Sequence, residues 1–322
     1  MAKEKQIELF SLQTPTEAEI FCKLQQNFAP QYKAVFHDKM AAKTVVVIPS
    51  LTLDPIILAK IDGIVHYEER LLCLLLLLRM PKTHIIYVTS TPIDPIIIDY
   101  YLHLLPGITG DHARQRMHFF SCYDTSPVSL TEKILARPRL IKRMMNAIPD
   151  GHLAHLACFN VTEHERKLAV TLGLPVYGCN PDLLFWGTKS GSREIFKECG
   201  VDIPFGFENL QNEEQVIKAL ADLYENNPLI RKAVIKMNDG FSGEGNAVFS
   251  YQKLSGTEDI ESQIRVLLPA EIEIVASDLS YQQFMHKLTS MGGIVEAFID
   301  APEKASPSVQ CRINPLGKID II

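Results

Sequence analysis

The chain has 322 residues, of which 47% are hydrophobic and 22% are charged, a composition that is ordinary for a globular protein of two or more domains. Its formal net charge of -6 and the lack of a basic cluster with interleaved aromatic residues argue against a nucleic-acid-binding protein. Its 7 cysteines are dispersed without a CxxC pair, which indicates neither a zinc site nor a disulfide framework and is typical of a reducing cytoplasm.

Residues 1–40 predict an N-terminal helical segment. The first ten residues lack the apolar core of a signal peptide. Thr14 to Glu17 reads as a capping box with Pro15 at the first helical position. Apolar residues then follow at helical spacing, so we expect an amphipathic helix that packs on another element.

Residues 41–185 predict an α/β domain with a wound parallel sheet. Strands are expected at 44–48, 84–89, 116–121, 153–160 and 174–177, with helices such as 96–105 and 131–143 between them. In such a sheet, ligands bind beyond the carboxyl ends of the strands. The polar residues at these ends are candidates for substrate contact, although caps and turns explain most of them equally well: Ser50, Thr52, Asp54, Ser90, Thr91 and Asn160.

One very apolar run, Leu71 to Leu78, is flanked by Arg70 and Arg79. It falls short of the roughly 20 residues that a membrane span needs, so it predicts a fully buried core helix and no membrane partner. The preceding run from His66 to Arg70 is either a polar cluster in a cleft or a helix N-terminus with acidic residues on its dipole.

Residues 233–249 predict two short strands joined by a loop that carries Gly240, Gly243 and Gly245. Such a loop exposes backbone N–H groups and leaves no Cβ in the way of a phosphate. Lys236 stands on the strand just before it, within reach of the same phosphate. Taken alone, the stretch fits a flexible hairpin tip at least as well as a phosphate-binding loop.

Two common nucleotide-binding motifs are excluded. Lys189 lies near a helix start among small residues and suits an anion site, but Thr188 stands where a P-loop requires glycine. The glycines of the later loop have the order GxxGxG and precede a strand, unlike a dinucleotide-binding fingerprint. The first parallel strand also ends in Pro49-Ser50, which disfavours an NAD-dependent enzyme.

Four segments in this order resemble an ATP-grasp ligase: 187–190 leading into a helix, 199–204, 234–238 with its glycine loop, and 294–299. Further strings resemble bacterial ATP-grasp proteins related to the pheganomycin-type peptide ligase, at 48–54, 66–70, 187–193, 240–246 and 308–315. The resemblance covers most of the chain from about residue 44. It implies a pre-ATP-grasp domain followed by an α+β ATP-grasp domain over 186–322.

Such enzymes use ATP and Mg²⁺ to join a carboxylate to an amine or amino acid through an acyl phosphate. The resemblance implies that Lys189 and Lys236 bind phosphates, that the loop from Gly240 covers them, and that Glu296 lies at the adenine edge, although a solvated strand residue remains an alternative for Glu296. Asp300 or Glu303 would meet the ribose, and Arg312 would face the acyl phosphate as a catalytic residue. The implied nucleotide site is Lys189, Lys236, Gly240, Ser242, Gly243, Glu244, Gly245, Glu296, Ala297, Phe298, Ile299 and Asp300.

The magnesium ligands of the family are not identified in this sequence. The string 312–315 resembles the asparagine motif of the metal site but lacks the preceding glutamate, so we interpret Asn314 as structural. We therefore expect a chain that ends before the second grasp lobe is complete and that turns over ATP only weakly. The alternative is a non-catalytic nucleotide-binding or interaction protein that kept the fold without its metal site.

Overall fold

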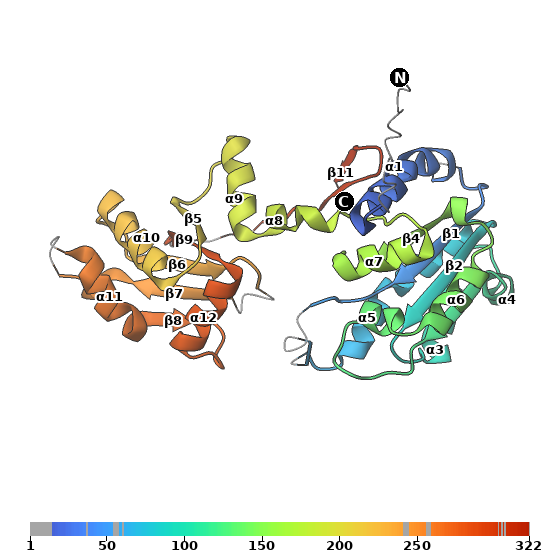
Figure 1. The fold of residues 1–322 in the computed structure, drawn as a ribbon, viewed down its shortest axis with the longest axis horizontal. Helices are drawn as coiled ribbons and strands as arrows, with labels where there is room; N and C mark the ends of the chain where they lie inside the picture. The colour runs from blue at the N-terminus through green and yellow to red at the C-terminus, as the bar shows by residue number, and fades with distance from the viewer. Residues whose placement is uncertain are drawn as a thin grey trace, which may run out of the picture. The chain divides into compact units, whose positions relative to one another are not determined.

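The computed structural model describes residues 15–36, 38–53, 58–59, 61–240, 245–255, 259–301, 303, 305 and 307–321. The chain divides into two compact units, drawn in Figure 1. The first unit comprises Met1–Pro181 together with Ser308–Ile322, and the second comprises Asp182–Pro307. The antiparallel hairpin of β10 (Cys311–Ile313) and β11 (Ile319–Ile321) thus belongs to the first unit, whereas the sequence assigned it to the ATP-grasp domain.

The first unit contains the predicted parallel sheet. Its strands have the order β3-β2-β1-β4, and every neighbouring pair is parallel. The predicted fifth strand forms only an isolated bridge between Leu156 and Val176. Because β2 and β3 extend the sheet on one side of β1 and β4 lies on the other, the winding reverses between β1 and β4. The strands are β1 (Lys43–Ile48), β2 (Thr83–Thr89), β3 (Met117–Ser121) and β4 (Ala154–Cys158).

Helices cover both faces of this sheet. One face is covered by α1 (Glu17–Val35), α5 (Leu130–Leu135), α6 (Pro138–Ala147) and α7 (Glu163–Leu172). The other is covered by the 3₁₀ helix η1 (Ile64–Arg79), α3 (Pro95–His103) and α4 (Gly110–Arg114). Val46 and Ile48 of β1 belong to the first core, while Val45 and Val47 belong to the second. The short 3₁₀ helix η2 (Gly151–Leu153) precedes β4. A strand buried on both faces explains the unbroken apolar run.

Two helix boundaries differ from the sequence prediction. The capping box of α1 is formed by Thr16 and Glu19 rather than by Thr14 and Glu17, and Thr14 lies outside the described residues. The single helix expected over 131–143 is two helices, α5 and α6. Pro138 explains this break, because proline has no N–H to continue a helix and is preferred at the first position of a new one.

The leucine-rich run forms a 3₁₀ helix with one buried face, not the fully buried helix that we expected. Leu72, Leu75 and Leu78 are fully buried, whereas Cys73, Leu76 and Arg79 are exposed. This spacing of three follows from the three residues per turn of a 3₁₀ helix. Among the helices of the described residues, none is both long and apolar enough to cross a bilayer.

The second unit is an antiparallel sheet whose core lies on one face, under three helices. The strand order is β5-β9-β6-β7-β8, and the strands are β5 (Gly206–Leu210), β6 (Lys232–Met237), β7 (Asn246–Ser250), β8 (Ile272–Ile274) and β9 (Gly293–Ala297). The core lies between the sheet and helices α10 (Glu213–Asn226), α11 (Ile260–Glu271) and α12 (Tyr281–Met291). Before and between these elements lie η3 (Pro181–Leu183), α8 (Leu184–Gly187), α9 (Lys189–Glu198) and η4 (Tyr251–Lys253).

Strand alternation decides which residues of this sheet can meet a ligand. Ala233, Ile235 and Met237 are buried in the core, so Val234 and Lys236 point to the opposite face. Glu296 of β9 pairs directly with Val234 and therefore shares that face. Helix α9 packs against β5 and β9.

A buried histidine in the first unit makes its stability depend on pH. His155 on β4 is 2% exposed and lies among aromatic rings, with ring centroids 5.3 Å from Phe28 and 5.2 Å from Phe36. Burial, with a smaller contribution from Lys43, lowers the pKa of His155 to about 3. The folded unit therefore holds this imidazole neutral at pH values where the unfolded chain would protonate it.

We expect acidification to destabilise the wild type more than a His155→Phe variant. The unfolded histidine takes up a proton below about pH 6.5 and the folded one does not, so stability falls by about 2 kcal/mol between pH 7.5 and pH 5. Urea unfolding followed by circular dichroism at the two pH values measures this difference. A His152→Phe variant is the control, because His152 is exposed. Equal pH dependence in wild type and His155→Phe would contradict the assignment.

Candidate functional site

The polar residues predicted at the carboxyl edge of the parallel sheet form two groups. The first ties the loops after β1 and β4 together. The backbone of Thr52 donates to Asn160 Oδ1 at 2.9 Å and accepts from Asn160 Nδ2 at 2.9 Å. The Thr52 hydroxyl donates to Glu165 Oε1 at 2.6 Å and lies 2.8 Å from the hydroxyl of Ser50. These contacts support the structural interpretation of Ser50, Thr52 and Asn160.

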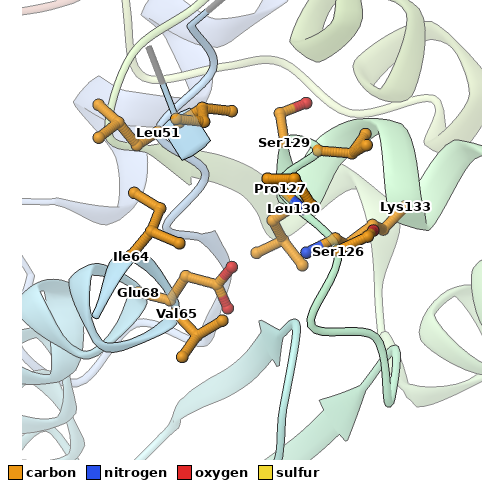
Figure 2. Close-up of a pocket in the computed structure, with 11 residues that line it drawn as sticks. Leu51, Ile64, Val65, Glu68, Ser126, Pro127, Ser129, Leu130 and Lys133 are labelled. Atoms are coloured by element: carbon orange, nitrogen blue, oxygen red, sulfur yellow. The ribbon is translucent and has the colours of Figure 1, made fainter. Parts of the chain in front are cut away.

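The second group lies around Ser90, at the end of β2, whose partners Glu68 and Lys133 line a pocket (Figure 2). Its amide and hydroxyl donate to the buried carboxylate of Glu68, and its hydroxyl accepts from Lys133. The carbonyl of Thr91 accepts from the Thr89 hydroxyl at 2.6 Å, which is a turn contact. Asp54 lies outside the described residues. Of the polar cluster suggested at His66 to Arg70, Glu68 lines the pocket.

In the second unit, the N-terminus of α9 is anchored by a fully buried serine. Ser190 donates from its amide at 3.0 Å and from its hydroxyl at 2.7 Å to Oδ1 of Asn238, just after β6. The Ser190 hydroxyl also accepts from the amide of Asn209 at 3.0 Å. Asn209 has a positive φ of 61° and lies where the β5 register shifts, so a bulge turns its amide toward α9. Lys189 is therefore held next to the end of β6.

At the end of β6, Lys189 also lies next to the glycine loop. A Cβ on Gly240 would lie 3.7 Å from Lys189 Nζ and 3.2 Å from the Cα of Gly245. The two glycines thus approach so closely at the neck of the loop that a side chain at either position would require the facing backbone to shift. Burial is the main cause of a lowered pKa of Lys189, and the charge of Lys236 adds to it while Asp239 opposes it. Ser242, Gly243 and Glu244 lie outside the described residues.

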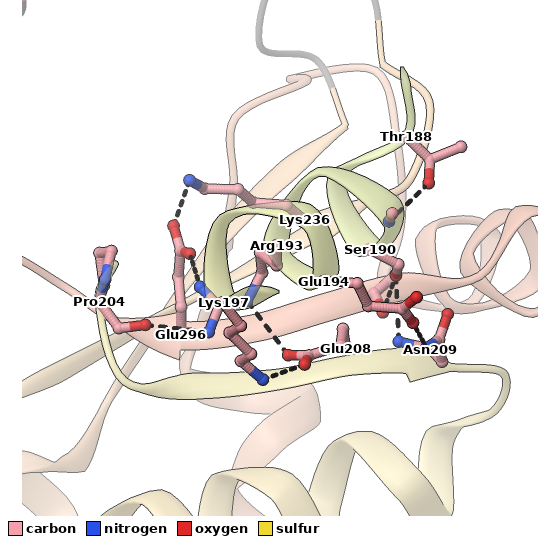
Figure 3. Close-up of polar contacts among 12 residues, drawn as sticks. Thr188, Ser190, Arg193, Glu194, Lys197, Pro204, Glu208, Asn209, Lys236 and Glu296 are labelled. Carbon is pink, nitrogen blue, oxygen red and sulfur yellow. Dashed lines mark hydrogen bonds and ion pairs between the residues drawn. The ribbon is translucent and has the colours of Figure 1, made fainter. Parts of the chain in front are cut away.

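Lys236 and Glu296 meet in a network of buried charges (Figure 3). The Glu296 carboxylate accepts from Lys236 with one oxygen and from Arg193 Nη1 at 2.7 Å with the other. Arg193, which is 4% exposed, also donates to Glu208 at 3.2 Å and to the Pro204 carbonyl at 2.9 Å. The guanidinium therefore lies between two carboxylates.

Sequence reasoning did not assign a role to Arg193, although it lies in the string 187–193 that carries the resemblance. The available signal was its spacing: Arg193 follows Lys189 by four residues, which places both on one side of α9. Its partners come from β5 and β9, whose pairing joins Gly206 to Glu296 across 90 residues of sequence. That pairing is visible only in the fold.

The expected adenine edge is partly engaged within the protein. The amide of Ala297 donates to the Phe205 carbonyl at 2.8 Å, and the amide of Phe298 donates to the Lys232 carbonyl at 3.2 Å. Contacts from these two residues to a base would therefore use their carbonyl oxygens. Ile299 and Asp300 are exposed, as is Glu303. The roles given to all five residues stay predictions.

The C-terminal hairpin places Arg312 in the first unit, where its guanidinium lies 5.5 Å from the centre of the Tyr177 ring. Asn314 shapes the turn of this hairpin. Its Oδ1 accepts from the amides of Leu316 at 3.0 Å and Lys318 at 3.2 Å. This supports the structural interpretation of Asn314, whereas the catalytic role of Arg312 stays a prediction.

The residues present differ in how well they fit ATP and Mg²⁺. Lys189, Lys236 and the glycines of the loop suit the phosphates of ATP, because two cations lie near a backbone that carries no Cβ at Gly240 and Gly245. For a metal ion, a search of the described residues finds no group of three or more His, Cys, Asp or Glu side chains with suitable geometry. The Mg²⁺ ligands therefore stay unassigned.

Known proteins with similar sequences support the same interpretation. Residues 183–273 match the family model described as IQCH-like, ATP-grasp. The chain is 26% identical over 297 residues to L-propargylglycine--L-glutamate ligase of Streptantibioticus cattleyicolor, across 89% of this chain and 59% of that protein. It is 23% identical over 346 residues to IQ motif-containing protein H of Danio rerio, across 94% of this chain and 32% of that protein.

The chain thus spans less than two thirds of the length of either relative. The matches confirm the resemblance to the ATP-grasp ligase superfamily that the sequence motifs indicated. The region matched by the family model begins just before α8 and ends in β8, so it contains Lys189, Arg193, Lys236 and the glycine loop.

We expect Arg193→Met to destabilise the second unit by about 3 kcal/mol, because it leaves the buried carboxylate of Glu296 and the partly buried carboxylate of Glu208 without their shared cation. The matched control is Lys197→Met, which removes a partner of the same Glu208 from a side chain that is 50% exposed. Its cost should stay below about 1 kcal/mol. Urea unfolding followed by circular dichroism gives both values, and similar costs would show that the Arg193 network is not the stabilising element.

Proposed function

We propose that the protein is an ATP-dependent ligase that joins a carboxylate to an amine through an acyl phosphate, acting in the cytoplasm. The observation that carries this proposal is the position of Lys189. Its ammonium lies beside Gly240 at the neck of the glycine loop. The charge of Lys236 contributes to the lowered pKa of Lys189, so the two cations are near each other. Two cations beside a loop that carries three glycines suit the phosphates of a nucleotide better than a plain hairpin tip.

The lysines, rather than the helix backbone, would supply the donors at α9. The amide of Ser190 donates to Asn238, and that of Gly191 donates to the capping hydroxyl of Thr188 at 3.1 Å. The amide of Lys189 donates to the Asn238 carbonyl at 3.4 Å. The first N–H groups of the helix are therefore engaged. A phosphate at this end would be bound by Lys189 Nζ and by the loop.

Arg193 allows Lys236 to change partners. In the structure, Lys236 pairs with one oxygen of Glu296, and Arg193 pairs with the other. If Lys236 turns to a phosphate, the carboxylate keeps the buried guanidinium as its counter-ion. The exchange therefore leaves no unpaired buried charge, which would be costly. Arg193 would in this way position Lys236 for binding without touching the nucleotide.

Beside α9, the face of the second sheet that carries Lys236 offers a binding surface for the base. Val234 and Val248 pair across β6 and β7 on the face that carries Lys236, and both are half-buried. Apolar side chains next to a cation suit the aromatic ring and the phosphates of ATP. We place Glu296, Ala297, Phe298 and Ile299 at the edge of this surface, with Asp300 beyond it.

The reaction would follow the chemistry of the family. The γ-phosphoryl group passes to an oxygen of the substrate carboxylate and ADP leaves; the amine then attacks the acyl carbon and inorganic phosphate leaves. Lys189 and Lys236 would stabilise the charge on the transferred group. Mg²⁺ bound with the nucleotide would neutralise further phosphate charge. The name of the bacterial relative favours amino acids as substrates.

A second candidate function is nucleotide binding without catalysis. One relative is named as an IQ motif-containing protein rather than as an enzyme, and the matching family model carries the same designation. On this alternative, the lysines and the glycine loop would bind ATP, and no phosphoryl transfer would follow. Binding and turnover therefore have to be measured separately.

We expect Lys236→Met and Lys189→Met each to weaken ATP binding at least about tenfold, because each removes a charge-assisted hydrogen bond worth ~1.5 kcal/mol or more. Calorimetric titration with and without Mg²⁺ measures the affinity. Lys253→Met is the control, since Lys253 pairs with Glu271 and is 64% exposed. If all three variants bind ATP alike, the proposed nucleotide site is wrong.

We expect ADP to form only when ATP, Mg²⁺ and an amino acid are present together. Hydroxylamine should trap the acyl phosphate as a hydroxamate, and Lys236→Met should lower both products at least about tenfold. A panel of L-amino acids, assayed for ADP and hydroxamate, tests this. ATP binding that is lost in Lys236→Met, without ADP from any member of the panel, would favour the non-catalytic alternative.

A further inference from the structure

The two edges of the first unit's parallel sheet differ in how their backbone groups are satisfied. At the β4 edge, the bridge at Val176 is capped by Gln25, which accepts from the Val176 amide at 2.7 Å and donates to the Val176 carbonyl at 3.0 Å. Gln31 donates to the carbonyl of Ala154 at 3.0 Å. Both glutamines belong to α1, and Ala154 and Leu156 beneath it are fully buried. Helix α1 therefore closes this edge.

The opposite edge, at β3, has unused backbone groups. Among the described residues, β3 pairs with β2 alone. These bonds use alternate residues of β3, because the carbonyl of Arg116 accepts from β2 and the amide of Cys122 donates to it. Successive residues of a strand direct their backbone groups to opposite sides, so those of Met117, Phe119 and Ser121 face away from β2. In the part of the chain that the structure describes, no other element bonds to the backbone of these three residues.

Strand β3 also lacks the features that commonly protect an edge strand. Natural edges are blocked by lysine, proline, a bulge or a covering element. The sequence of Met117–Ser121 contains neither lysine nor proline, and its register with β2 is regular. All five residues of β3 are partly or fully exposed, whereas β1 is buried throughout. The edge is therefore accessible to a further strand.

The helix beside this edge carries basic charges only. Helix α6 packs against β3, and Arg143 Cζ lies 4.9 Å from the centre of the Phe120 ring. Arg139 precedes Arg143 by four residues and therefore lies on the same side of α6. Both arginines are exposed, as is Lys142, and the helix contains no Asp or Glu. Across the described ranges, none of these three cations has a carboxylate within 4.0 Å. On a chain of net charge -6, this surface selects for an acidic partner.

We propose that the β3 edge binds an extended, acidic peptide segment of another protein as an additional strand of the sheet. The outward backbone groups of β3 supply the main-chain hydrogen bonds of such a complex. Side chains of the peptide alternate between the two faces of the sheet. Those on the face of Phe120 meet Arg139 and Arg143, so acidic residues fit there, and those on the face of Phe119 pack as apolar residues.

A second copy of the chain fits this edge less well. Two β3 strands related by a two-fold axis at Phe119 would place His118 of each copy opposite Phe120 of the other. The same axis would bring both α6 helices to one face of the joined sheet. The unpaired arginines of the two helices would then approach each other, and like charges across a strand pair are unfavourable. An acidic peptide instead supplies the missing counter-charges.

Titration calorimetry of the full chain with a short, end-capped peptide of alternating Glu and Val tests the proposal. This peptide should bind, and one of alternating Lys and Val should bind at least about tenfold more weakly, because its charges repel those of α6. Two N-methylated forms, at every Val or at every Glu, remove N–H groups from opposite edges of the peptide. One of them should bind at least about tenfold more weakly than the other, since only one edge pairs with β3. These changes leave the fold of the protein untouched.

A charge reversal in the protein provides the complementary measurement. Arg143→Glu should weaken binding of the Glu–Val peptide at least about tenfold. The matched control is Lys33→Glu, which changes the net charge equally at an exposed position of α1, beside the other edge; it should change the affinity less than about threefold. Bound peptide should slow hydrogen exchange in residues 117–121 and not in 154–158. Lys236→Met should bind the peptide like the wild type, because Lys236 lies in the other unit.

The proposal is overturned if the Glu–Val peptide does not bind, if its two N-methylated forms bind alike, or if Arg143→Glu and Lys33→Glu have equal effects. Sedimentation velocity of the chain without peptide tests the alternative occupant. A dimer whose formation slows hydrogen exchange in residues 117–121 would assign the edge to a second copy and overturn the proposal as well.

Discussion

The fully buried hydroxyl of Ser190 is the contact on which the candidate nucleotide site depends. It joins the first turn of α9 to Asn238 after β6 and to the bulge of β5 at Asn209. Without it, the buried Oδ1 of Asn238 would lose a partner, at a cost of about 1–3 kcal/mol, and the amide of Asn209 would lose its acceptor as well. Because Lys189 and Arg193 lie on the same helix, this anchor also sets where both cations meet the sheet.

Two glycines allow close packing around Ser190 and Asn238. A Cβ on Gly191 would lie 2.1 Å from the Phe185 carbonyl, so α8 and α9 can join at this angle only with glycine there. Gly292 has a φ of +74°, and a Cβ there would lie 2.8 Å from Asn238 Nδ2. Asn238, which accepts from Ser190, therefore packs directly against the backbone of Gly292. The glycines around the site serve packing as well as access for a ligand.

The sequence predicted those features that depend on local pattern. The apolar runs identified the parallel strands, and the glycine loop after Lys236 was recognised from its composition. Pro138 also indicates the break between α5 and α6 in the sequence, although one helix was predicted over 131–143. The leucine-rich run was ambiguous. Consecutive leucines fit the three residues per turn of a 3₁₀ helix as well as the roughly 3.6 residues per turn of an α-helix, so the sequence does not distinguish the two.

Other features depend on residues that the chain brings together from far apart. Arg193 has a role only because β5 and β9 pair beneath α9 and bring Glu208 and Glu296 to its guanidinium. The pocket of Glu68 likewise needs the end of β2 and the start of α5 beside η1.

The two carboxylates at the edge of the parallel sheet show why burial alone does not separate structural from functional groups. Glu68 and Glu165 are both buried and both accept from hydroxyls that end strands or begin helices. The difference lies in the remaining hydrogen-bonding capacity and in the space it faces. Glu165 closes a loop contact, whereas Glu68 faces a pocket in which its positive counterpart is reached only through a serine. Burial therefore has to be interpreted together with the hydrogen bonds that a carboxylate accepts and the space that its oxygens face.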